Sequence, residues 1–187
     1  MSQLPTPGTY VVDDSHSHVG FITRHLVASK VRGSFTDFEA TIEIGESPET
    51  SKVSATVQAG SITTHNEARD GHLMSPDFLD LENHPTLDFV STAIRPKGDD
   101  FELVGDLTIR GVTKQVTWTL EFLGSSPSMV EGVTVVGFEA KVDIDRRDFN
   151  VNFDGALENG SLVVANKVTL VLEIEAASVV PAEQAAS

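Results

Sequence analysis

The sequence contains no cysteine. This absence excludes disulfide bonds, thiolate metal sites and cysteine nucleophiles, but it indicates no compartment because a stable core needs no disulfide. Basic residues are also few: 13 Lys and Arg stand against 28 Asp and Glu, and the formal net charge is -15. The mean field of such a chain repels phosphate backbones and anionic lipid headgroups, so we predict that nucleic acid is not a partner.

Long apolar runs are missing as well. No stretch approaches the roughly 18 apolar residues of a membrane-spanning helix, and the opening segment MSQLPTPGTY has neither the basic start nor the apolar stretch of a signal peptide. We therefore predict a cytoplasmic protein without stable membrane insertion. The 187 residues, 40% hydrophobic and 22% charged, fit one globular domain with a sizeable core.

Motifs for covalent catalysis are absent too. The chain has neither a GxSxG nucleophile elbow nor a phosphate-binding Walker loop, and no acidic residue is marked as a triad partner. The charged runs at 145–148 and 69–70 are predicted to be turn and ion-pair elements, because charges at strand ends are usually solvated or locally paired. We predict that the protein is not an enzyme and uses no cofactor.

Six histidines raise the question of a metal site. His16 and His18 are two residues apart and would share a strand face, whereas His25 has the parity of Val19 and Phe21 and would point to the other side. A zinc site needs converging ligands, which this parity does not supply. Structural or solvent-facing histidines are therefore favoured, and no bound metal is predicted.

The dominant pattern in the chain is an alternation of apolar and polar residues with a period of two, which is typical of strands with one buried face. The clearest case runs from Leu162 to Ile174, with Lys167, Thr169 and Glu173 on the opposite face. Similar stretches occur at 10–12, 19–25, 53–57, 87–94, 101–109, 116–122 and 136–145. Punctuated by Gly, Pro, Asp and Asn, they predict about eight or nine strands.

One stretch changes parity part of the way along. The apolar positions from Val31 to Phe35 share one face, and those from Phe38 to Ile44 continue on the opposite face. A bulge near Thr36 and Asp37 would keep both sets of side chains inside and would bend the strand, as a closing barrel requires.

Only residues 64–85 suggest helix. Thr64 or Asn66 is a candidate N-cap for a short helix through Leu73, and Ser75 followed by Pro76 predicts a second helical turn through Leu81. The apolar side chains of this insertion would cover one mouth of a barrel, either as a gate or as a plain plug. They are Leu73, Met74, Phe78, Leu79 and Leu81.

Long one-sided strands with a single helical insertion favour an antiparallel barrel or sandwich over an α/β fold. Strands of 10 or more residues suit a tall barrel, since about eight strands leave a lumen that side chains fill or that holds one ligand. We predict a barrel at 9–176 between a disordered N-terminus at 1–8 and a disordered tail at 177–187.

The order and spacing of several fragments resemble the YceI-like family of polyisoprenoid-binding, lipocalin-like barrels. The fragments are HSHVGFITRH (16–25), VRGSFTDFEATI (31–42), SITTHNEARDGHLMSPDFLD (61–80), HPTLDFVST (84–92), LVGDLTIRGVTKQV (103–116) and IDRRDFNV (144–151). The resemblance implies an eight-stranded antiparallel barrel whose apolar pore holds an isoprenoid or similar lipid. The chain departs from the family at Asn150, where Gly is usual, although Asn tolerates a left-handed backbone. We also expect it to lack the signal peptide that many members of the family carry.

The predicted function is binding of a long-chain amphiphilic lipid, of polyprenyl phosphate or quinone type, for storage, transport or sequestration. The alternatives are a fatty acid or fatty amide binder, or a non-lipid interaction module with a filled barrel. A homodimer is also expected from the resemblance.

The predicted ligand-binding residues are the inward apolar side chains of the strands and of the insertion. They are Phe21, Phe35, Phe38, Phe78, Phe89, Leu107, Trp118, Leu120, Phe138, Val142, Leu170 and Leu172. For each of them taken alone, core packing is favoured over ligand contact, and the ligand prediction belongs to the set. An anionic head group would need local cations, and the candidates are His25, Arg69 and Arg110. Further cations that could lie around one mouth of the barrel are Arg24, Lys30, Arg32 and Lys114.

Overall fold

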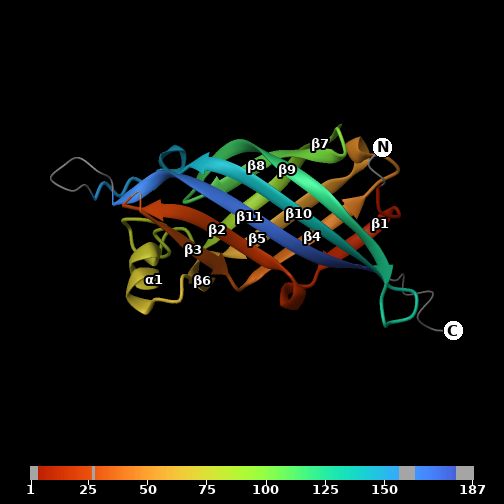
Figure 1. Ribbon diagram of the computed structural model, residues 1–187, viewed down its shortest axis with the longest axis horizontal. Coiled ribbons are helices and arrows are strands. Elements are labelled where there is room, and N and C mark those ends of the chain that lie inside the picture. Colours follow the sequence, from red (N-terminus) through yellow and green to blue (C-terminus); the bar gives the residue numbers. More distant parts are fainter. Residues whose placement is uncertain (1–3, 27, 156–162, 180–187) are drawn as a thin grey trace.

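The strands of the computed structural model wrap around one long axis (Figure 1). The structure describes residues 4–26, 28–155 and 163–179. Its strands are β1 (Gly8–Val12), β2 (His18–His25), β3 (Ser29–Phe35), β4 (Phe38–Ile44), β5 (Lys52–Gln58), β6 (Ile62–Thr63), β7 (Thr86–Lys97), β8 (Asp100–Ile109), β9 (Val112–Pro127), β10 (Thr134–Asp145) and β11 (Val164–Ser178). The helices are α1 (Glu67–Met74) and the short 3-10 helices η1 (Asp14–His16), η2 (Pro48–Thr50), η3 (Ala59–Ser61) and η4 (Arg146–Phe149).

The barrel closes through β1. This strand pairs with β4 on one side and with β11 on the other, so the order β1-β4-β5-β7-β8-β9-β10-β11 returns to its start. At the α1 end, β2 pairs with β11, β3 with β2, and β6 with β3, and these strands extend the wall. Every pairing is antiparallel, and the eight-stranded antiparallel barrel predicted from the sequence is confirmed.

The parity change between β3 and β4 is a break in the strand. Thr36 and Asp37 belong to neither strand, and their backbone groups form hydrogen bonds with other segments. Thr36 N–H donates to the Ser61 carbonyl at 3.3 Å, and the Asp37 carbonyl accepts from Gln58 N–H at 2.9 Å. Because the break adds residues between the two strands, Phe35 and Phe38 both face the interior of the barrel.

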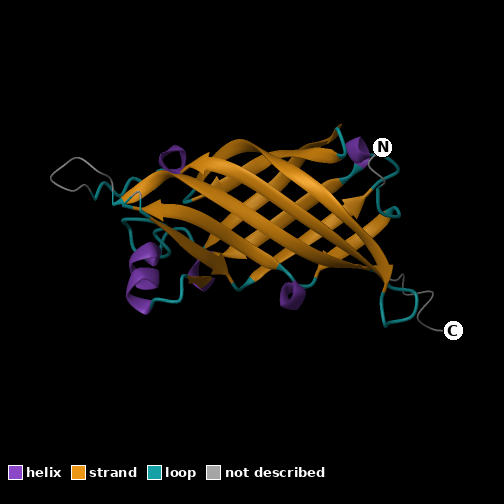
Figure 2. Cartoon of the chain, in the orientation of Figure 1, coloured by secondary structure: helices purple, strands orange, loops and turns teal. Residues whose placement is uncertain are grey.

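The helical insertion is shorter than predicted. The Asn66 side chain caps α1 by accepting from Arg69 N–H at 3.0 Å, and the helix ends at Met74. The predicted second helical segment from Ser75 is wrong, because residues 75–83 form turns, in which Phe78 N–H donates to the Ser75 carbonyl. Asp80 has a φ of 55°, which no α-helix accommodates. Figure 2 shows α1 at one end of the barrel, outside the strand wall.

The strands extend slightly beyond the predicted barrel boundaries of 9–176 at both ends. Strand β11 continues through Ser178, which pairs with Tyr10 of β1. Near the N-terminus, the Tyr10 hydroxyl donates to the Thr6 carbonyl at 2.8 Å. Residues 1–3, 156–162 and 180–187, which include Leu162 and most of the predicted tail, lie outside the described residues.

Two clusters of apolar side chains lie inside the barrel. One gathers around Phe101, Trp118 and Phe149, and the other around Tyr10 and Val136. Among the described residues, no helix is both long and apolar enough to cross a membrane.

Candidate ligand-binding lumen

Three cavities lie inside the barrel. The middle cavity has a volume of about 140 Å³ and is bordered by Phe38, Phe89 and Trp118, among others. The helix-end cavity, of about 120 Å³, is lined by Leu73 of α1 and by Phe78 and Leu79 of the turns that follow it. The N-terminal cavity, of about 80 Å³, is lined by Leu4 and Pro5.

The three cavities lie end to end. The middle and N-terminal cavities share Ile42, Val53, Leu103, Leu172 and Ile174 in their linings, and the middle and helix-end cavities share Phe35, Leu87, Ile109 and Leu170. Their outer members belong to opposite ends of the molecule, namely α1 and the N-terminal segment (Figure 1). The free space therefore follows the barrel axis, as a long and narrow ligand requires.

Most of the sequence-predicted ligand residues lie on this path. Phe21 and Phe78 line the helix-end cavity; Phe38, Phe89, Leu107 and Trp118 line the middle cavity; Leu120 and Phe138 line the N-terminal cavity; Phe35, Leu170 and Leu172 each line two. Val142 borders none of the three and packs against the larger core cluster. That these side chains contact a ligand stays a prediction.

Aromatic side chains from neighbouring strands pack against each other in the lumen. Phe89 of β7 and Trp118 of β9 meet edge to face with ring centroids 6.0 Å apart. Phe122 and Phe138 are 5.3 Å apart beside the N-terminal cavity. Such pairs are worth about 0.5–1.5 kcal/mol beyond the area they bury, and they narrow the lumen without closing it.

Polar groups in the lining are few, and most have partners. In the middle cavity, the Asp88 carboxylate accepts from Thr56 at 2.8 Å and from Thr86 at 2.9 Å. The Trp118 Nε1–H is different, because it is buried and has no hydrogen-bond partner among the described residues.

Arg146 is a buried cation that the sequence analysis did not single out. It is 5% exposed and lines the helix-end cavity. Its guanidinium donates to the carbonyls of Val151 at 2.6 Å, Phe153 at 2.9 Å and Ala165 at 3.2 Å. Burial lowers the pKa of the Arg146 side chain from its ordinary value, although a guanidinium stays charged in proteins. Among the described residues, Arg146 is the one cation in the lining of the three cavities.

The head-group candidates lie elsewhere. His25, Arg69 and Arg110 border none of the three cavities. Arg69 donates to the Thr64 hydroxyl at 2.6 Å and to its carbonyl at 2.9 Å, so it orders the start of the insertion. Arg110 donates to the carbonyls of Phe78 and Asn150 at 2.9 Å each, which ties the β8–β9 turn to the segments around the helix-end cavity.

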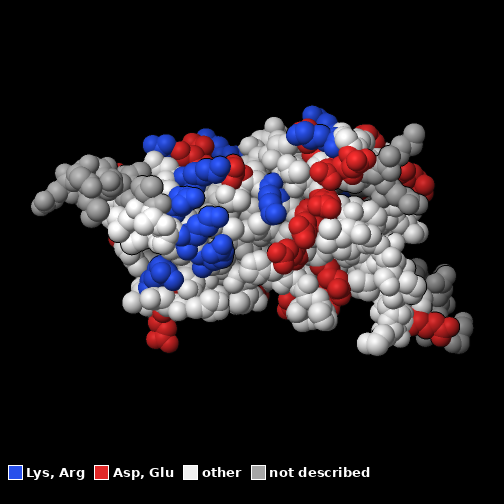
Figure 3. Space-filling model, viewed as in Figure 1, with Lys and Arg blue, Asp and Glu red and all other residues white. Residues whose placement is uncertain are grey.

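The remaining cations considered for a head group are outside the barrel. Arg24, Lys30, Arg32 and Lys114 are all exposed. On the face in Figure 3, most Lys and Arg lie toward the α1 end and most Asp and Glu toward the opposite end. Most cations of this face therefore belong to the outer surface at the α1 end.

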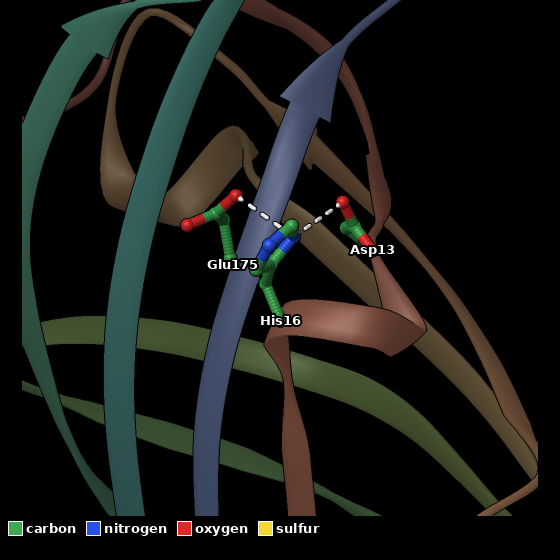
Figure 4. A group of neighbouring side chains, drawn as sticks. All are labelled: Asp13, His16 and Glu175. Carbon is green, nitrogen blue, oxygen red and sulfur yellow. Dashed lines mark hydrogen bonds and ion pairs between the residues drawn. The ribbon is translucent and has the colours of Figure 1, made fainter.

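Asp13, His16 and Glu175 form the cluster drawn in Figure 4. His16 Nδ1 lies 2.9 Å from Asp13 Oδ2 and 3.7 Å from Glu175 Oε1, and the ligand atoms of the three residues lie within 4.8 Å of one another. Hydrogen bonds from Ser15 and His16 lower the pKa of Asp13 to about 2, and the Asp13 carboxylate raises the pKa of His16. All three side chains are more than a third exposed.

The expectation that His16 and His18 share a strand face is wrong. His16 lies in η1 and His18 begins β2, because Asp13 caps η1 and interrupts the strand. Asp13 and His16 are three residues apart, whereas Glu175 joins them through the pairing of β1 and β2 with β11, which no local spacing signals.

The charged run at 145–148 ends β10 and begins the 3-10 helix η4; the predicted local ion pair forms at Arg147, whereas Arg146 is buried and is not solvated or locally paired. Arg147 pairs with Asp145 (Nη2 to Oδ2, 2.5 Å), and the hydrogen bonds from Arg147 lower the pKa of Asp145 to about 2. Asn150 ends η4 with φ 58° and ψ 22°, which is the left-handed conformation that Asn tolerates.

Comparison with known proteins supports this architecture. The model of the YceI-like domain matches residues 10–176. A UPF0312 protein of Staphylococcus aureus strain MSSA476 is 37% identical over 161 residues, which cover 85% of this chain and 91% of the relative. A Campylobacter jejuni YceI protein has a TM-score of 0.73 and 27% identity over 96% of this chain and all of its own.

Two further solved structures share the fold at lower identity. Burkholderia cenocepacia BcnA has a TM-score of 0.73 at 22% identity, and covers 88% of this chain and 98% of its own. A polyisoprenoid-binding domain from Saccharophagus degradans has a TM-score of 0.65 at 12% identity, and covers 91% and 98%. With a family match over most of its length, the chain belongs to the YceI-like family.

Proposed function

We propose that the protein binds a long-chain lipid of polyisoprenoid type inside the barrel and stores, carries or sequesters it. The observation that carries this proposal is the row of three apolar cavities along the axis of a closed barrel. Packed interiors seldom contain voids larger than a water molecule, because each void forfeits dispersion contacts. Three adjoining voids at one axis are more readily explained by a guest chain than by imperfect packing.

The chemistry of the lining favours an apolar guest over water. An engineered cavity of about 150 Å³ lined by Leu, Ile and Phe stays dry and binds benzene, and the middle cavity is similar in size and lining. Each CH₂ that moves from water into such a lumen contributes about 0.8 kcal/mol, so a chain that runs through all three cavities gains affinity with length.

The polar end of the lipid belongs at the helix-end cavity. Arg146 places a buried positive charge there, and the N-terminal cavity has no charged side chain in its lining. Four backbone carbonyls take up most of the five N–H groups of this guanidinium, so its charge acts on a head group mainly through space. A polyprenyl phosphate and a quinone both remain compatible with this placement, as does a fatty acid or a fatty amide.

Binding, and not catalysis, is the activity we assign to this barrel. The shared fold with a domain described as polyisoprenoid-binding supports an isoprenoid guest, although at 12% identity the likeness itself extends to the fold alone. A non-lipid interaction module would need a filled barrel, which the three cavities disfavour. A cytoplasmic location and homodimerisation are further parts of the proposal.

The test is extraction of the purified full-length protein with organic solvent, followed by mass spectrometry of the extract. We expect an amphiphilic lipid in stoichiometric amount, visible also as a mass increment in native mass spectrometry. A parallel sample of an unrelated protein purified in the same way is the control for carried-over lipid. A lipid-free extract, together with failure of the emptied protein to take up any prenyl or acyl lipid, would refute the proposed function.

A further inference from the structure

Residues 4–7, the N-terminal segment that precedes β1, border the lumen at one end of the barrel. Pro5 is buried and Leu4 is half-buried, and both residues line the N-terminal cavity. Leu4 also packs against the larger apolar cluster inside the barrel. This segment is therefore part of the boundary of the lumen, although it belongs to none of the strands.

The strand pairing places the segment at the mouth opposite α1. Strand β1 begins in register with Ile44, the last residue of β4. Ile44, Ser51 and Phe101 line the N-terminal cavity as well, and they lie beside the turns that join β4 to β5 and β7 to β8. The cavity thus reaches the ends of the strands, and Leu4 and Pro5 border it there.

Two features fix the place of the N-terminal segment. Pro5 and Pro7 restrict φ to a narrow range, so the backbone of the segment has little freedom. The Thr6 carbonyl between them accepts a hydrogen bond at 2.8 Å from the hydroxyl of Tyr10, whose side chain is 2% exposed in the barrel wall. A stiff segment that is anchored to the wall presents Leu4 and Pro5 at a defined position.

The proposed orientation of the lipid brings the end of its tail to this position. The buried cation Arg146 lies in the lining of the helix-end cavity, and the middle cavity lies between that cavity and the N-terminal one. The lining of the N-terminal cavity is apolar except for Ser51. A chain whose polar end lies near Arg146 therefore reaches Leu4 and Pro5 with its apolar end, if it is long enough.

We propose that Leu4 and Pro5 are the stop that sets the length of the lipid chain that the barrel accepts. Up to the stop, each further CH₂ moves from water into the lumen and raises the affinity. A longer chain has to push Leu4 and Pro5 out toward water, and this exposure offsets the gain. The inference rests on the proposed function, because it assumes that a lipid occupies the lumen, and it adds the residues that select the chain length.

Variants that change the size of residue 4 test the stop in two directions. The probes are geraniol, farnesol, geranylgeraniol and longer prenyl alcohols, which displace a fluorescent fatty acid from the full-length protein. Wild-type affinity should rise with each isoprene unit up to one length and then level off. Leu4→Ala should raise the affinity about tenfold for the first alcohol beyond that limit, and Leu4→Phe should lower it about tenfold for the alcohol at the limit, since tenfold corresponds to roughly two CH₂ groups.

The shortest alcohols should bind all these proteins alike, because they do not reach residue 4. Pro7→Ala is the matched control: Pro7 belongs to the same segment, but it is exposed and borders none of the three cavities, so the whole length profile should stay as in the wild type. Far-ultraviolet circular dichroism and the urea midpoint of each variant check that it is folded.

A photoreactive lipid tests the contact itself. One geranylgeranyl probe carries a diazirine at the end of its tail, and a second carries the diazirine beside the hydroxyl. After illumination and proteolysis, mass spectrometry should find the tail-labelled probe on Leu4 or Pro5, and the head-labelled probe on residues of the helix-end cavity such as Leu73 and Phe78.

The outcomes separate this inference from the proposed function. If the limiting length is the same in the wild type, Leu4→Ala and Leu4→Phe, or if both variants weaken every alcohol by one factor, the stop is refuted and lipid binding stands. Tail-labelled probe on the helix-end cavity would also refute the stop, because the chain would then run in the opposite direction. If the wild type binds neither the fluorescent fatty acid nor any alcohol, the proposed function fails, and this inference fails with it.

Discussion

The ring of Phe89 occupies the space where a Cβ atom on Gly105 would lie. A methyl group built there would stand 2.4 Å from Phe89 Cζ and 2.6 Å from the Val90 carbonyl oxygen. Gly105 is on β8, in register with Ser91 of β7, and its lack of a side chain leaves room for the Phe89 ring, which packs edge to face on Trp118. The absence of a side chain at one position thus shapes the middle cavity.

Gly105→Ala should therefore destabilise the barrel by about 1–3 kcal/mol, because the new methyl group displaces a packed aromatic ring and meets backbone. The measurement is the urea midpoint at constant m-value. Gly71→Ala is the matched control: Gly71 is in α1 with nothing within 4 Å of its added Cβ, and this change should stabilise by about 0.5–1 kcal/mol. Equal midpoints for the two variants would contradict the packing described for Phe89.

Arg146→Met should destabilise the protein by about 3 kcal/mol or more. The substitution leaves the carbonyls of Val151, Phe153 and Ala165 buried without their donor, and each such loss costs about 1–3 kcal/mol. Arg147→Met is the control, since Arg147 is exposed and pairs with Asp145 alone among the described residues; it should change the denaturation midpoint little. Similar losses for both arginines would show that the Arg146 bonds do not hold this end of the barrel together.

Stability should depend on pH through His16 and Asp13. The pKa of His16 is raised in the folded state, so its contribution is complete below the unfolded value of 6.5 and is lost as the pH rises through the raised value. The pKa of Asp13 is lowered to about 2, so its contribution is complete above 3.8 and is lost as the pH falls toward 2. Both groups therefore contribute fully to stability only between pH 3.8 and pH 6.5.

Urea midpoints measured across this range test the cluster. The wild type should lose stability above pH 6.5 relative to His16→Gln, and the difference between the two should be largest between pH 3.8 and 6.5. Asp13→Asn should remove most of this alkaline loss, because Asp13 is the nearer of the two carboxylates that pair with His16 and the larger cause of its raised pKa. Parallel pH profiles for the wild type and His16→Gln would count against this coupling.

The same cluster is expected to hold no metal in the purified protein. The one histidine and the two exposed carboxylates already pair with one another through a hydrogen bond and an ion pair. A tight metal site needs a closed set of ligands that further hydrogen bonds hold in place. Elemental analysis should find no stoichiometric zinc or iron, and a chelator should leave the thermal midpoint unchanged. A chelator-sensitive midpoint that His16→Gln abolishes would overturn this prediction.

The barrel and much of its lumen can be predicted from the sequence because inward and outward side chains alternate along a β-strand, so that apolar and polar residues alternate in the sequence. In β9, Trp118 and Leu120 line cavities, whereas the alternate residues Thr117 and Thr119 are exposed. The parity change at Thr36 and Asp37 also follows from this rule, since a residue that leaves the ladder shifts the phase of all later ones.

The parts that the sequence did not predict depend on contacts between distant segments. Arg146 and Arg147 are adjacent and chemically identical, yet one is buried among carbonyls of β11 and of the segment after η4, and the other is exposed. Their difference is set by which side of η4 packs on the barrel. Likewise, the turns at 75–83, where a second helical turn was predicted, include the left-handed Asp80, and no sequence signal marks that residue.

The most direct test of the central claim, that the lumen binds the lipid chain, is displacement of a fluorescent lipid by prenyl lipids of increasing length. Wild-type affinity should rise with chain length until the lumen is full. Phe138→Ala, which enlarges the N-terminal cavity, should extend that limit or weaken binding, whereas Glu139→Ala, the next residue on β10 and outside the lining of all three cavities, should do neither. Affinity that does not change with chain length, or equal effects of the two substitutions, would contradict a lipid site inside the barrel.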